Sequence, residues 1–598
     1  MIKKSKYTES PLRYIRRKTR VVNVGNIEIG GNNPVRVQTM TNTDTNDVEA
    51  TVKQCLEVYN EGAELIRITT QGLKEVKSLI KIKQELTDRN VFVPLIADVH
   101  FSRKVAEYAA TIIDKVRINP GNYAEKKGKN IEEEVKPFLN ICRKHKTAIR
   151  IGTNHGSLSE RIMNSYGDSP EGMAESAMEF LRICIKEKFY DVIVSLKASN
   201  PLIMIYAYRL LIVKMQEENM DFPLHLGVTE TGYGNIGRIK SAIGIGSLMS
   251  DGIGDTIRVS LTENPVQEIP VAKKLVKQFS DYDNLNSNFE NSHSKFFPYP
   301  FDYKRRESFQ VLNIGKSKPP VVVGAFGKDK SGSDYQFSDN EEGIKKALIN
   351  EYSKKFPVYT LKEYVKAGNF SSQMNFVRVS VSDIGDNEEL IKKNIELISN
   401  DTTLVIILET NSEYPPGERR RFFSLLKEYN CKNPVIIHLS YDISDEESFM
   451  LKAAVDAGIL FIDGLGDGLW IENKNSSQEF INSVSFDILQ ACRVRLTQPD
   501  YISCPGCGRT LFRLLETTEK IKQHTAHLKG LKIAIMGCIV NGPGEMADAD
   551  YGYVGASAGK INLYKSKNII KKNIPEDRAV EELINLIKEK GDWKEKTS

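Results

Sequence analysis

The sequence lacks any long apolar segment. Within its 598 residues, no run approaches the roughly 18 apolar residues that a membrane helix needs. The first residues are basic but contain no apolar core of the kind found in a secretory signal. Both absences predict a cytoplasmic protein that does not enter a membrane.

A strong charge excess is also missing. Lys and Arg total 83 and Asp and Glu total 78, a formal net charge of +5. A balance this even argues against a nucleic-acid-binding protein or one that docks on a membrane surface. Any function that needs positive charge must therefore depend on a local cluster.

Cysteine is scarce, and most of it is scattered. Only eight cysteines occur, and five of them, Cys55, Cys142, Cys184, Cys431 and Cys492, show no spacing that suggests pairing. This argues against a secreted disulfide scaffold and fits a reducing cytosol. We expect these five to be packing residues.

The other three cysteines share one short C-terminal stretch. Cys504-Pro-Gly-Cys507 predicts a turn that aims two sulfurs at one point, and a Gly-Pro-Gly turn links Cys538 to Glu545. Structural zinc usually takes four Cys or His ligands. Three thiolates with a weaker oxygen ligand instead suit a 4Fe–4S cluster with one exchangeable iron. Zinc and a redox disulfide are the alternatives at this point.

Eight short apolar runs alternate with amphipathic helical stretches in the N-terminal half. The runs span residues 35–41, 65–70, 94–100, 115–119, 147–154, 191–198, 224–230 and 256–261. Eight βα units in about 250 residues predict an α/β fold, the TIM (β/α)8 barrel, over residues 1–279. A doubly wound sheet is the alternative.

Polar residues gather where these runs end. In a TIM barrel the C-terminal strand ends form the active-site mouth. They carry Gln38, Arg67, Asp98, His100, Arg117, Asn119, Arg150, Asn154, Lys197, Glu230, Arg258 and Ser260. Five of them are cations, which are costly to bury unless an anion compensates them, and guanidinium groups suit phosphate oxygens. The mouth therefore predicts a phosphorylated substrate, with ion pairing inside the barrel as the alternative for any single cation.

A glycine-rich loop follows the seventh run. Gly232-Tyr-Gly234-Asn-Ile-Gly237 fits the pattern GxGxxG, but a dinucleotide fingerprint normally occupies the first βα turn. Barrels often bind phosphate with a loop at this later position. We interpret it as part of the anion mouth, with an ordinary flexible loop as the alternative.

A polar, Asn- and Ser-rich stretch at residues 280–303 predicts a linker, followed by an inserted α/β domain at 304–488. We expect strands there at 320–325, 376–381, 404–408, 434–439 and 460–462, a helix at 388–399, and a solvated helix start at 419–421. Residues 463–471 repeat the pattern of 251–259, with Trp470 at the place of Arg258 and Glu472 at that of Ser260. This predicts a degenerate barrel copy that serves as a scaffold, unless the match is accidental.

The last predicted domain, residues 489–598, is an α+β iron–sulfur module. Its expected elements are a helix at 509–529, a strand at 531–537, a hairpin of 551–556 with 560–564, and a closing helix at 575–590.

Several separate segments resemble the 4-hydroxy-3-methylbut-2-enyl diphosphate synthases of the methylerythritol phosphate route to isoprenoids. They include Ala97-Asp-Val-His100, Arg117-Ile-Asn-Pro-Gly-Asn122, Cys504-Pro-Gly-Cys507-Gly-Arg-Thr and the stretch from Gly537 to Glu545. The long middle domain resembles the three-domain form of that family.

The resemblance implies a function. Such enzymes open 2-C-methyl-D-erythritol 2,4-cyclodiphosphate and remove a hydroxyl with two electrons, drawn from flavodoxin or ferredoxin through a 4Fe–4S cluster. Glu230 is then the candidate proton donor, with His100 orienting the substrate or sharing that role. The barrel mouth and the cluster loops must meet, within one chain or across a homodimer. A zinc-stapled phosphate-binding protein and a barrel lyase with a structural cluster are the competing interpretations.

Overall fold

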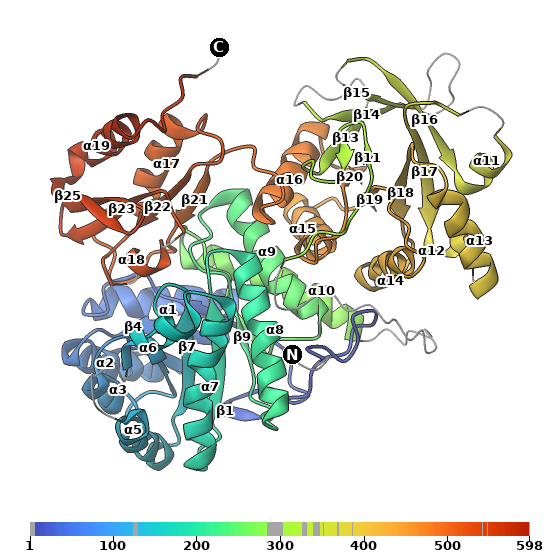
Figure 1. The fold of residues 1–598 in the computed structure, drawn as a ribbon. Coiled ribbons are helices and arrows are strands. Elements are labelled where there is room, and N and C mark those ends of the chain that lie inside the picture. The colour runs from blue at the N-terminus through green and yellow to red at the C-terminus, as the bar shows by residue number, and fades with distance from the viewer. Residues whose placement is uncertain are drawn as a thin grey trace. The chain divides into compact units, whose positions relative to one another are not determined.

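The computed structural model describes residues 6–123, 130–283, 303–325, 332–338, 347–350, 352–367, 370–385, 387–540, 542–546 and 548–596. It divides into two compact units. One comprises Met1–Tyr7, Arg16–Lys277 and Thr497–Ser598, and the other comprises Thr8–Ile15 and Gln278–Leu496. Figure 1 shows the elements of each. Most of the predicted linker, residues 284–302, lies outside the described residues, and the domain boundaries drawn from the sequence stay a prediction.

The first unit contains a TIM barrel, as predicted. Its strands are β3 (Arg36–Met40), β4 (Leu65–Thr69), β5 (Leu95–Asp98), β6 (Lys115–Ile118), β7 (Ala148–Asn154), β8 (Val192–Lys197), β9 (His225–Leu226) and β10 (Thr256–Ile257). They pair in the order β8-β7-β6-β5-β4-β3-β10-β9, with parallel neighbours throughout. A parallel backbone bridge between Val194 and Leu224 joins the two ends of this order. The eight-stranded sheet is therefore closed.

Helices follow the strands as local sequence signals require. They are α1 (Val48–Glu61), α2 (Leu73–Asp88), α3 (Arg103–Ala109), α4 (Pro120–Tyr123), α5 (Ile131–His145), α6 (Glu160–Tyr166), α7 (Pro170–Lys186), α8 (Pro201–Glu217), α9 (Gly234–Ser250) and α10 (Glu268–Asp283). Asp47 caps α1 by accepting from the N–H of Ala50, and Asn200 caps α8 ahead of a proline.

A hairpin closes the N-terminal end of the barrel. Its strands are β1 (Val22–Val24) and β2 (Ile27–Ile29), and its apolar side chains pack with Leu65, Ile96 and Ala148 from the bases of three barrel strands. This packing excludes water from that end. The strand ends at the opposite side remain for the site.

The C-terminal part of this unit is a five-stranded mixed sheet with helices. Its strands are β21 (Asp500–Ser503), β22 (Lys532–Met536), β23 (Tyr551–Ser557), β24 (Lys560–Lys565) and β25 (Asn568–Pro575), and its helices are α17 (Leu514–Thr525), α18 (Gly542–Glu545) and α19 (Glu576–Glu589). The predicted hairpin and closing helix are confirmed. The predicted helix at 509–529 is shorter in the structure, because residues 504–513 form the loop that carries two of the cysteines.

The second unit contains another closed barrel of eight strands. They are β13 (Val321–Ala325), β14 (Tyr335–Ser338), β15 (Ala347–Asn350), β16 (Lys355–Thr360), β17 (Asn375–Ser380), β18 (Leu404–Glu409), β19 (Val435–Tyr441) and β20 (Gly468–Asn473). Only β15 runs antiparallel to its two neighbours. Its helices are α11 (Leu361–Lys366), α12 (Val381–Ile384), α13 (Glu388–Ser399), α14 (Pro415–Glu428), α15 (Glu446–Ile462) and α16 (Gln478–Ala491). The predicted degenerate barrel is confirmed.

Two local predictions in this unit are wrong. Residues 460–462 are the last residues of α15 rather than a strand, because an apolar run inside a helix buried on all sides has no period that would reveal it. The arginines at 419 and 420 are buried rather than solvated, since they lie within α14 and Arg420 forms an ion pair with Asp463 at 2.7 Å.

The two barrels repeat the same hydrogen bonds at matching positions. Asp255 and Asp467 each accept hydrogen bonds from three groups: an arginine guanidinium, the hydroxyl of the residue three positions after that arginine, and the backbone N–H of a residue that follows a proline. These partners are Arg16, Thr19 and Leu224 for Asp255, and Arg305, Ser308 and Val435 for Asp467. A chance match of two glycine-rich strand edges would not reproduce three side-chain and backbone partners. The second barrel is therefore a structural repeat of the first.

Among the described residues, no helix has the length and apolarity needed to cross a membrane.

Candidate active site

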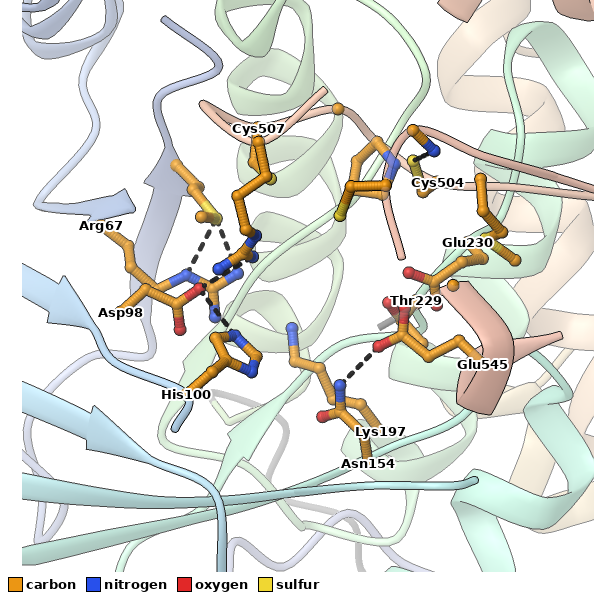
Figure 2. A pocket seen from close by; sticks show the side chains of 18 of the residues that line it. Arg67, Asp98, His100, Asn154, Lys197, Thr229, Glu230, Cys504, Cys507 and Glu545 are labelled. Atoms are coloured by element: carbon orange, nitrogen blue, oxygen red, sulfur yellow. Dashed lines mark hydrogen bonds and ion pairs between the residues drawn. The ribbon is translucent and has the colours of Figure 1, made fainter. Parts of the chain in front are cut away.

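One pocket of the first unit is lined by the barrel mouth and by the loops of the C-terminal sheet (Figure 2). The barrel contributes Met40, Arg67, Asp98, His100, Arg117, Asn154, Lys197, Thr229, Glu230 and Arg258. The C-terminal domain contributes all three cysteines of its motif, with Pro505, Gly506, Arg509, Met536, Gly537, Gly542 and Glu545. A single chain thus supplies both halves of the pocket.

Backbone contacts bring the two halves together. The N–H of Gly232 donates to the carbonyl of Ser503 at 3.3 Å, and Thr231 forms a parallel bridge with the same residue. The ammonium of Lys240 pairs with Asp500 at 2.7 Å. The glycine loop that we interpreted as an anion site therefore docks β21 against the barrel and does not line the pocket. The N–H of Gly234, at the start of α9, already donates to a Glu263 oxygen at 2.7 Å.

Asp98 organises one side of the pocket. Its Oδ1 lies 3.4 Å from Nη1 of Arg117, and its Oδ2 lies 3.3 Å from Nε2 of His100. Burial alone would raise the pKa of Asp98, but Arg67, His100 and Arg117 together hold it well below its usual range. Asp98 is therefore an anion that orients the groups around it.

His100 is a neutral imidazole in this setting. Burial, and next the positive charge of Arg117, lower the pKa of His100 to about 3. A histidine with this pKa carries no proton to give as imidazolium near neutral pH. This pKa argues against proton donation by an imidazolium, and the orienting role of His100 stays a prediction.

The cations differ in how they are compensated. Arg258 lies 3.4 Å from Glu268, so part of its charge is already compensated within the barrel. Arg67 donates to the thioether sulfur of Met40, a weak acceptor, and burial lowers its pKa to about 10, at which it keeps its charge. Burial, reinforced by nearby arginines, lowers the pKa of Lys197 well below its usual range. An incoming anion would relieve this repulsion.

Two glycines make room for these long side chains. A Cβ on Gly152 would lie 2.5 Å from Nε of Arg117, and one on Gly227 would lie 2.9 Å from Nζ of Lys197. Both side chains therefore reach the pocket only because the neighbouring strand carries no side chain there.

Four residues predicted to bind substrate do not line the pocket: Gln38, Asn119, Arg150 and Ser260. Each has an exposure of 1% or less. Arg150 is the third residue of the long strand β7, so it lies deeper in the barrel than Asn154 at the end of the same strand. Among the described residues, Nε and Nη1 of Arg150 and both amide atoms of Gln38 have no hydrogen-bond partner. Nζ of the buried Lys115 likewise has no hydrogen-bond partner among the described residues.

Glu230 and Glu545 face each other across the pocket. Nδ2 of Asn154 donates to Oε1 of Glu545 at 2.5 Å, a contact drawn in Figure 2. Burial, and next the nearby carboxylate of Glu545, raise the pKa of Glu230 well above its usual range. Glu230 also adopts a left-handed backbone conformation, with φ of 51°, which is uncommon for a residue with a side chain. A protonated carboxyl held in this way is suited to proton transfer.

A close approach of two backbones positions Glu545. The loop after β7 passes Gly156 so near to α18 that a Cβ there would lie 1.9 Å from the carbonyl oxygen of Gly544. In the other direction, a Cβ on Gly544 would lie 2.5 Å from the carbonyl oxygen of Gly156. Only glycine fits at both positions, and the contact aligns Glu545 with Asn154.

The three thiols of the motif line one pocket. Cys504, Cys507 and Cys538 are partly exposed, and Sγ of Cys504 accepts a hydrogen bond from the N–H of Gly537 at 3.2 Å. Burial of the sulfur, with the two other thiols nearby, raises the pKa of Cys504, so a bound cation would stabilise its thiolate. Among the described residues, no group of three Cys, His, Asp or Glu side chains is placed to hold a metal ion. By its chemistry, a donor set of three thiols with the Glu545 carboxylate in the same pocket suits an iron–sulfur cluster.

Sequence reasoning missed four residues of this region: Met40, Thr229, Arg509 and Glu268. Met40 ends β3 and Thr229 lies in the bend after β9, and neither carries a charge that would draw attention. Arg509 lies within the cysteine motif, where the metal ligands dominated the interpretation. Glu268 follows the last strand, and its pairing with Arg258 depends on tertiary structure.

Comparisons with known proteins identify the family of the chain. The chain matches the GcpE TIM-barrel domain over residues 19–273 and the GcpE protein C-terminal domain over residues 500–589. It is 45% identical, over 97% of this chain and 99% of the relative, to 4-hydroxy-3-methylbut-2-en-1-yl diphosphate synthase (flavodoxin) of Parabacteroides distasonis. The 4-hydroxy-3-methylbut-2-en-1-yl diphosphate synthase (ferredoxin), chloroplastic, of Arabidopsis thaliana is 39% identical over 99% of this chain and 90% of its own length.

Among solved structures, dihydropteroate synthase from Xanthomonas albilineans covers 44% of this chain and 99% of its own, with a TM-score of 0.30 and 12% identity. That likeness is too weak to carry an argument. The family matches cover both outer domains, and the two relatives align over nearly the full length of the chain. The chain belongs to the GcpE family.

Proposed function

We propose that this protein is the oxidoreductase that converts 2-C-methyl-D-erythritol 2,4-cyclodiphosphate to 4-hydroxy-3-methylbut-2-enyl diphosphate in isoprenoid precursor biosynthesis. One observation carries the proposal: a single pocket places four barrel cations opposite three thiols and a carboxylate of the same chain. The cations suit a diphosphate, and the thiols suit a redox cluster.

The cofactor of this reaction is a 4Fe–4S cluster. Cys504, Cys507 and Cys538 would hold it as thiolates, and Glu545 would be its exchangeable fourth ligand. When bound, such a cluster supplies single electrons and a Lewis-acidic iron. The contact of Gly156 with Gly544 supports this assignment, because it fixes the helix that carries Glu545 at the barrel mouth.

The residues of the chain bind, orient and protonate. Arg67, Arg117, Lys197 and Arg258 hold the diphosphate oxygens. Asp98 orients His100, which burial and the charge of Arg117 keep neutral. Glu230, protonated because burial and Glu545 raise its pKa, gives its proton to the hydroxyl that leaves as water. Enclosure by the C-terminal loops keeps bulk water from the reacting atoms.

The four predicted residues that do not line the pocket extend the same site. Gln38 and Arg150 lie deeper in the barrel than Met40 and Asn154 on the same strands. Asn119 and Ser260 follow the pocket-lining Arg117 and Arg258 along the chain. The unpartnered atoms of Arg150 and Gln38 support this role, because buried polar groups are normally paired.

The electron donor is flavodoxin or ferredoxin, the two donors that the relatives carry in their names. The reaction takes place in the cytoplasm. The second barrel is a scaffold. At its mouth His438 lies 2.9 Å from both Glu409 and Glu472, and its ring centroid lies 4.5 Å from that of Trp470 in a tilted arrangement. At the second mouth the charges of His438, Glu409 and Glu472 thus compensate one another, whereas the first mouth has a surplus of positive charge.

Anaerobic purification with iron and sulfide analysis tests the cofactor. We expect brown protein with about four irons and matching sulfide, and turnover of the cyclic diphosphate only when a reductant is present. Colourless protein that binds one zinc, or turnover without a reductant, would contradict the proposal.

Complementation tests whether one chain forms the whole site. We mix an Arg258→Ala variant with a Cys504→Ser variant. Because one chain supplies both halves of the pocket, the mixture should stay inactive. Recovered activity would mean that the working site forms across a homodimer.

A further inference from the structure

Arg509 enters the barrel mouth from the C-terminal domain. It lies two residues after Cys507, lines the pocket and is 8% exposed. The preceding residue, Gly508, is pressed against the barrel: a Cβ there would lie 2.6 Å from the carbonyl oxygen of Thr43. This close approach directs the Arg509 side chain into the pocket.

The partners of Arg509 come from both halves of the site. Its Nη2 lies 3.4 Å from Oδ2 of Asp98, and it lines the same pocket as Cys507. Burial alone would lower the pKa of Arg509, but Cys507 and Asp98 raise it. Its Nε is buried and has no partner among the described residues. A guanidinium normally uses its whole fork of donors, so the free Nε marks room for another acceptor.

The Asp98 carboxylate is shared by two guanidinium groups and by the neutral ring of His100. Arg117 lies 3.4 Å and His100 lies 3.3 Å from the same carboxylate, and both separations to arginine are long for a charge-assisted hydrogen bond. Positive charge at this point therefore exceeds the negative charge that faces it. A diphosphate would supply the missing acceptor oxygens.

We propose that Arg509 is a substrate-binding residue that the C-terminal domain supplies, and that it joins an oxygen of the bound diphosphate to the sulfur of Cys507. This inference rests on the proposed function and extends its binding site beyond the barrel. It adds a fifth cation to the four from the barrel strands.

Two consequences follow from this bridge. Substrate bound to the barrel becomes an attachment point for the C-terminal domain, so ligand affinity depends on Arg509. A cationic donor to the sulfur of Cys507 also stabilises the reduced, more negative cluster, because hydrogen bonds to sulfur tune reduction potential. A residue that served only to pair with Asp98 would contribute to folding stability and to neither property.

The test compares Arg509→Gln with Arg513→Gln in the anaerobic holoenzyme. Arg513 is a matched control, because it is an arginine of the same loop with a side chain that is 81% exposed. Calorimetric titration with the cyclic diphosphate should show affinity about ten- to a hundredfold weaker for Arg509→Gln, the usual value of a charged hydrogen bond, and an unchanged affinity for Arg513→Gln. A redox titration followed by electron paramagnetic resonance should show a lower midpoint potential for Arg509→Gln alone.

Equal affinities in the two variants would overturn the inference, whatever happens to folding stability. If Arg509→Gln does not fold, Arg509→Lys replaces it. This variant keeps the charge but loses the fork that joins two acceptors, so we expect intermediate affinity, and unchanged affinity and potential would contradict the bridge. Wild-type protein separates the two proposals: if it neither binds nor converts the cyclic diphosphate, the proposed function fails, whereas failure confined to the Arg509 variants concerns this inference alone.

Discussion

Replacing Gly156 by alanine should inactivate the protein without removing any chemical group. A Cβ there would lie 1.9 Å from the carbonyl oxygen of Gly544, and ordinary contact begins near 3.4 Å. The difference, about 1.5 Å, must be met by a shift of the loop or of α18, since both atoms belong to backbone or lie directly on it. Glu545 would move away from Asn154, to which it is hydrogen-bonded at 2.5 Å.

A displacement of about 1 Å at a reacting centre can cost about a hundredfold in rate. We therefore expect kcat to fall by about that factor in Gly156→Ala, measured anaerobically with reduced flavodoxin or ferredoxin. Affinity for the cyclic diphosphate should change much less, because the barrel cations stay in place.

Gly591→Ala is the matched control. Gly591 and Gly156 have similar positive φ values, 77° and 78°, but a Cβ on Gly591 would meet nothing within 4 Å. Both variants therefore carry a backbone cost of about 1–2 kcal/mol in stability, and only one carries the clash. Turnover of Gly156→Ala within about threefold of Gly591→Ala would refute the reasoning.

Three further predictions concern stability, measured by chemical or thermal unfolding. Lys115→Met should stabilise the first unit by about 1–3 kcal/mol, because burial lowers the pKa of Lys115 well below its usual range. The unfolded wild-type chain binds the lysine proton more tightly than the folded chain does. The stability gained by the variant should therefore shrink as pH rises toward 10.5. Burial alone would lower the pKa of His438, but hydrogen bonds to two glutamates raise it above 6.5. Wild type should therefore be more stable than His438→Gln near pH 6. This difference in stability should disappear as pH rises through the raised pKa. Arg209→Met should destabilise by about 3–5 kcal/mol, because it leaves the fully buried carboxylate of Asp251, now paired at 2.8 Å, without its cation. A gain for Lys115→Met that does not change with pH would contradict the first prediction, and equal pH dependence of wild type and His438→Gln would contradict the second. A loss of stability below about 1 kcal/mol for Arg209→Met would contradict the third.

The first barrel was predictable because parallel strands buried on both faces appear as short apolar runs between helical periods. Strand ends then indicated Arg67, Asp98 and Arg117. Depth along a strand was not predictable to the same precision. Arg150 and Gln38 are each the third residue of their strand and lie below the pocket, whereas Asn154 and Met40 end the same strands and line it.

Other features depend on tertiary contacts that leave no local signal. Strand β25 is largely exposed and pairs only with β24, so it lacks the apolar pattern by which strands are recognised. The glycine loop at residues 232–237 fits an anion-binding pattern, yet its role depends on β21, which lies more than 260 residues later in the chain. The backbone contact of Gly156 with Gly544 likewise depends on where two distant loops meet.

The shared contacts of Asp255 and Asp467 suggest how the second barrel arose. An internal gene duplication would have produced two equal copies, and each has kept the aspartate that ties its leading segment to the start of a strand. At the other end the copies diverged, from Arg258 to Trp470. Because folding determinants and catalytic groups lie at opposite ends of a barrel, one copy could lose its chemistry without losing its fold. The same separation makes the second mouth a place where a laboratory could install a new activity while the original one continues.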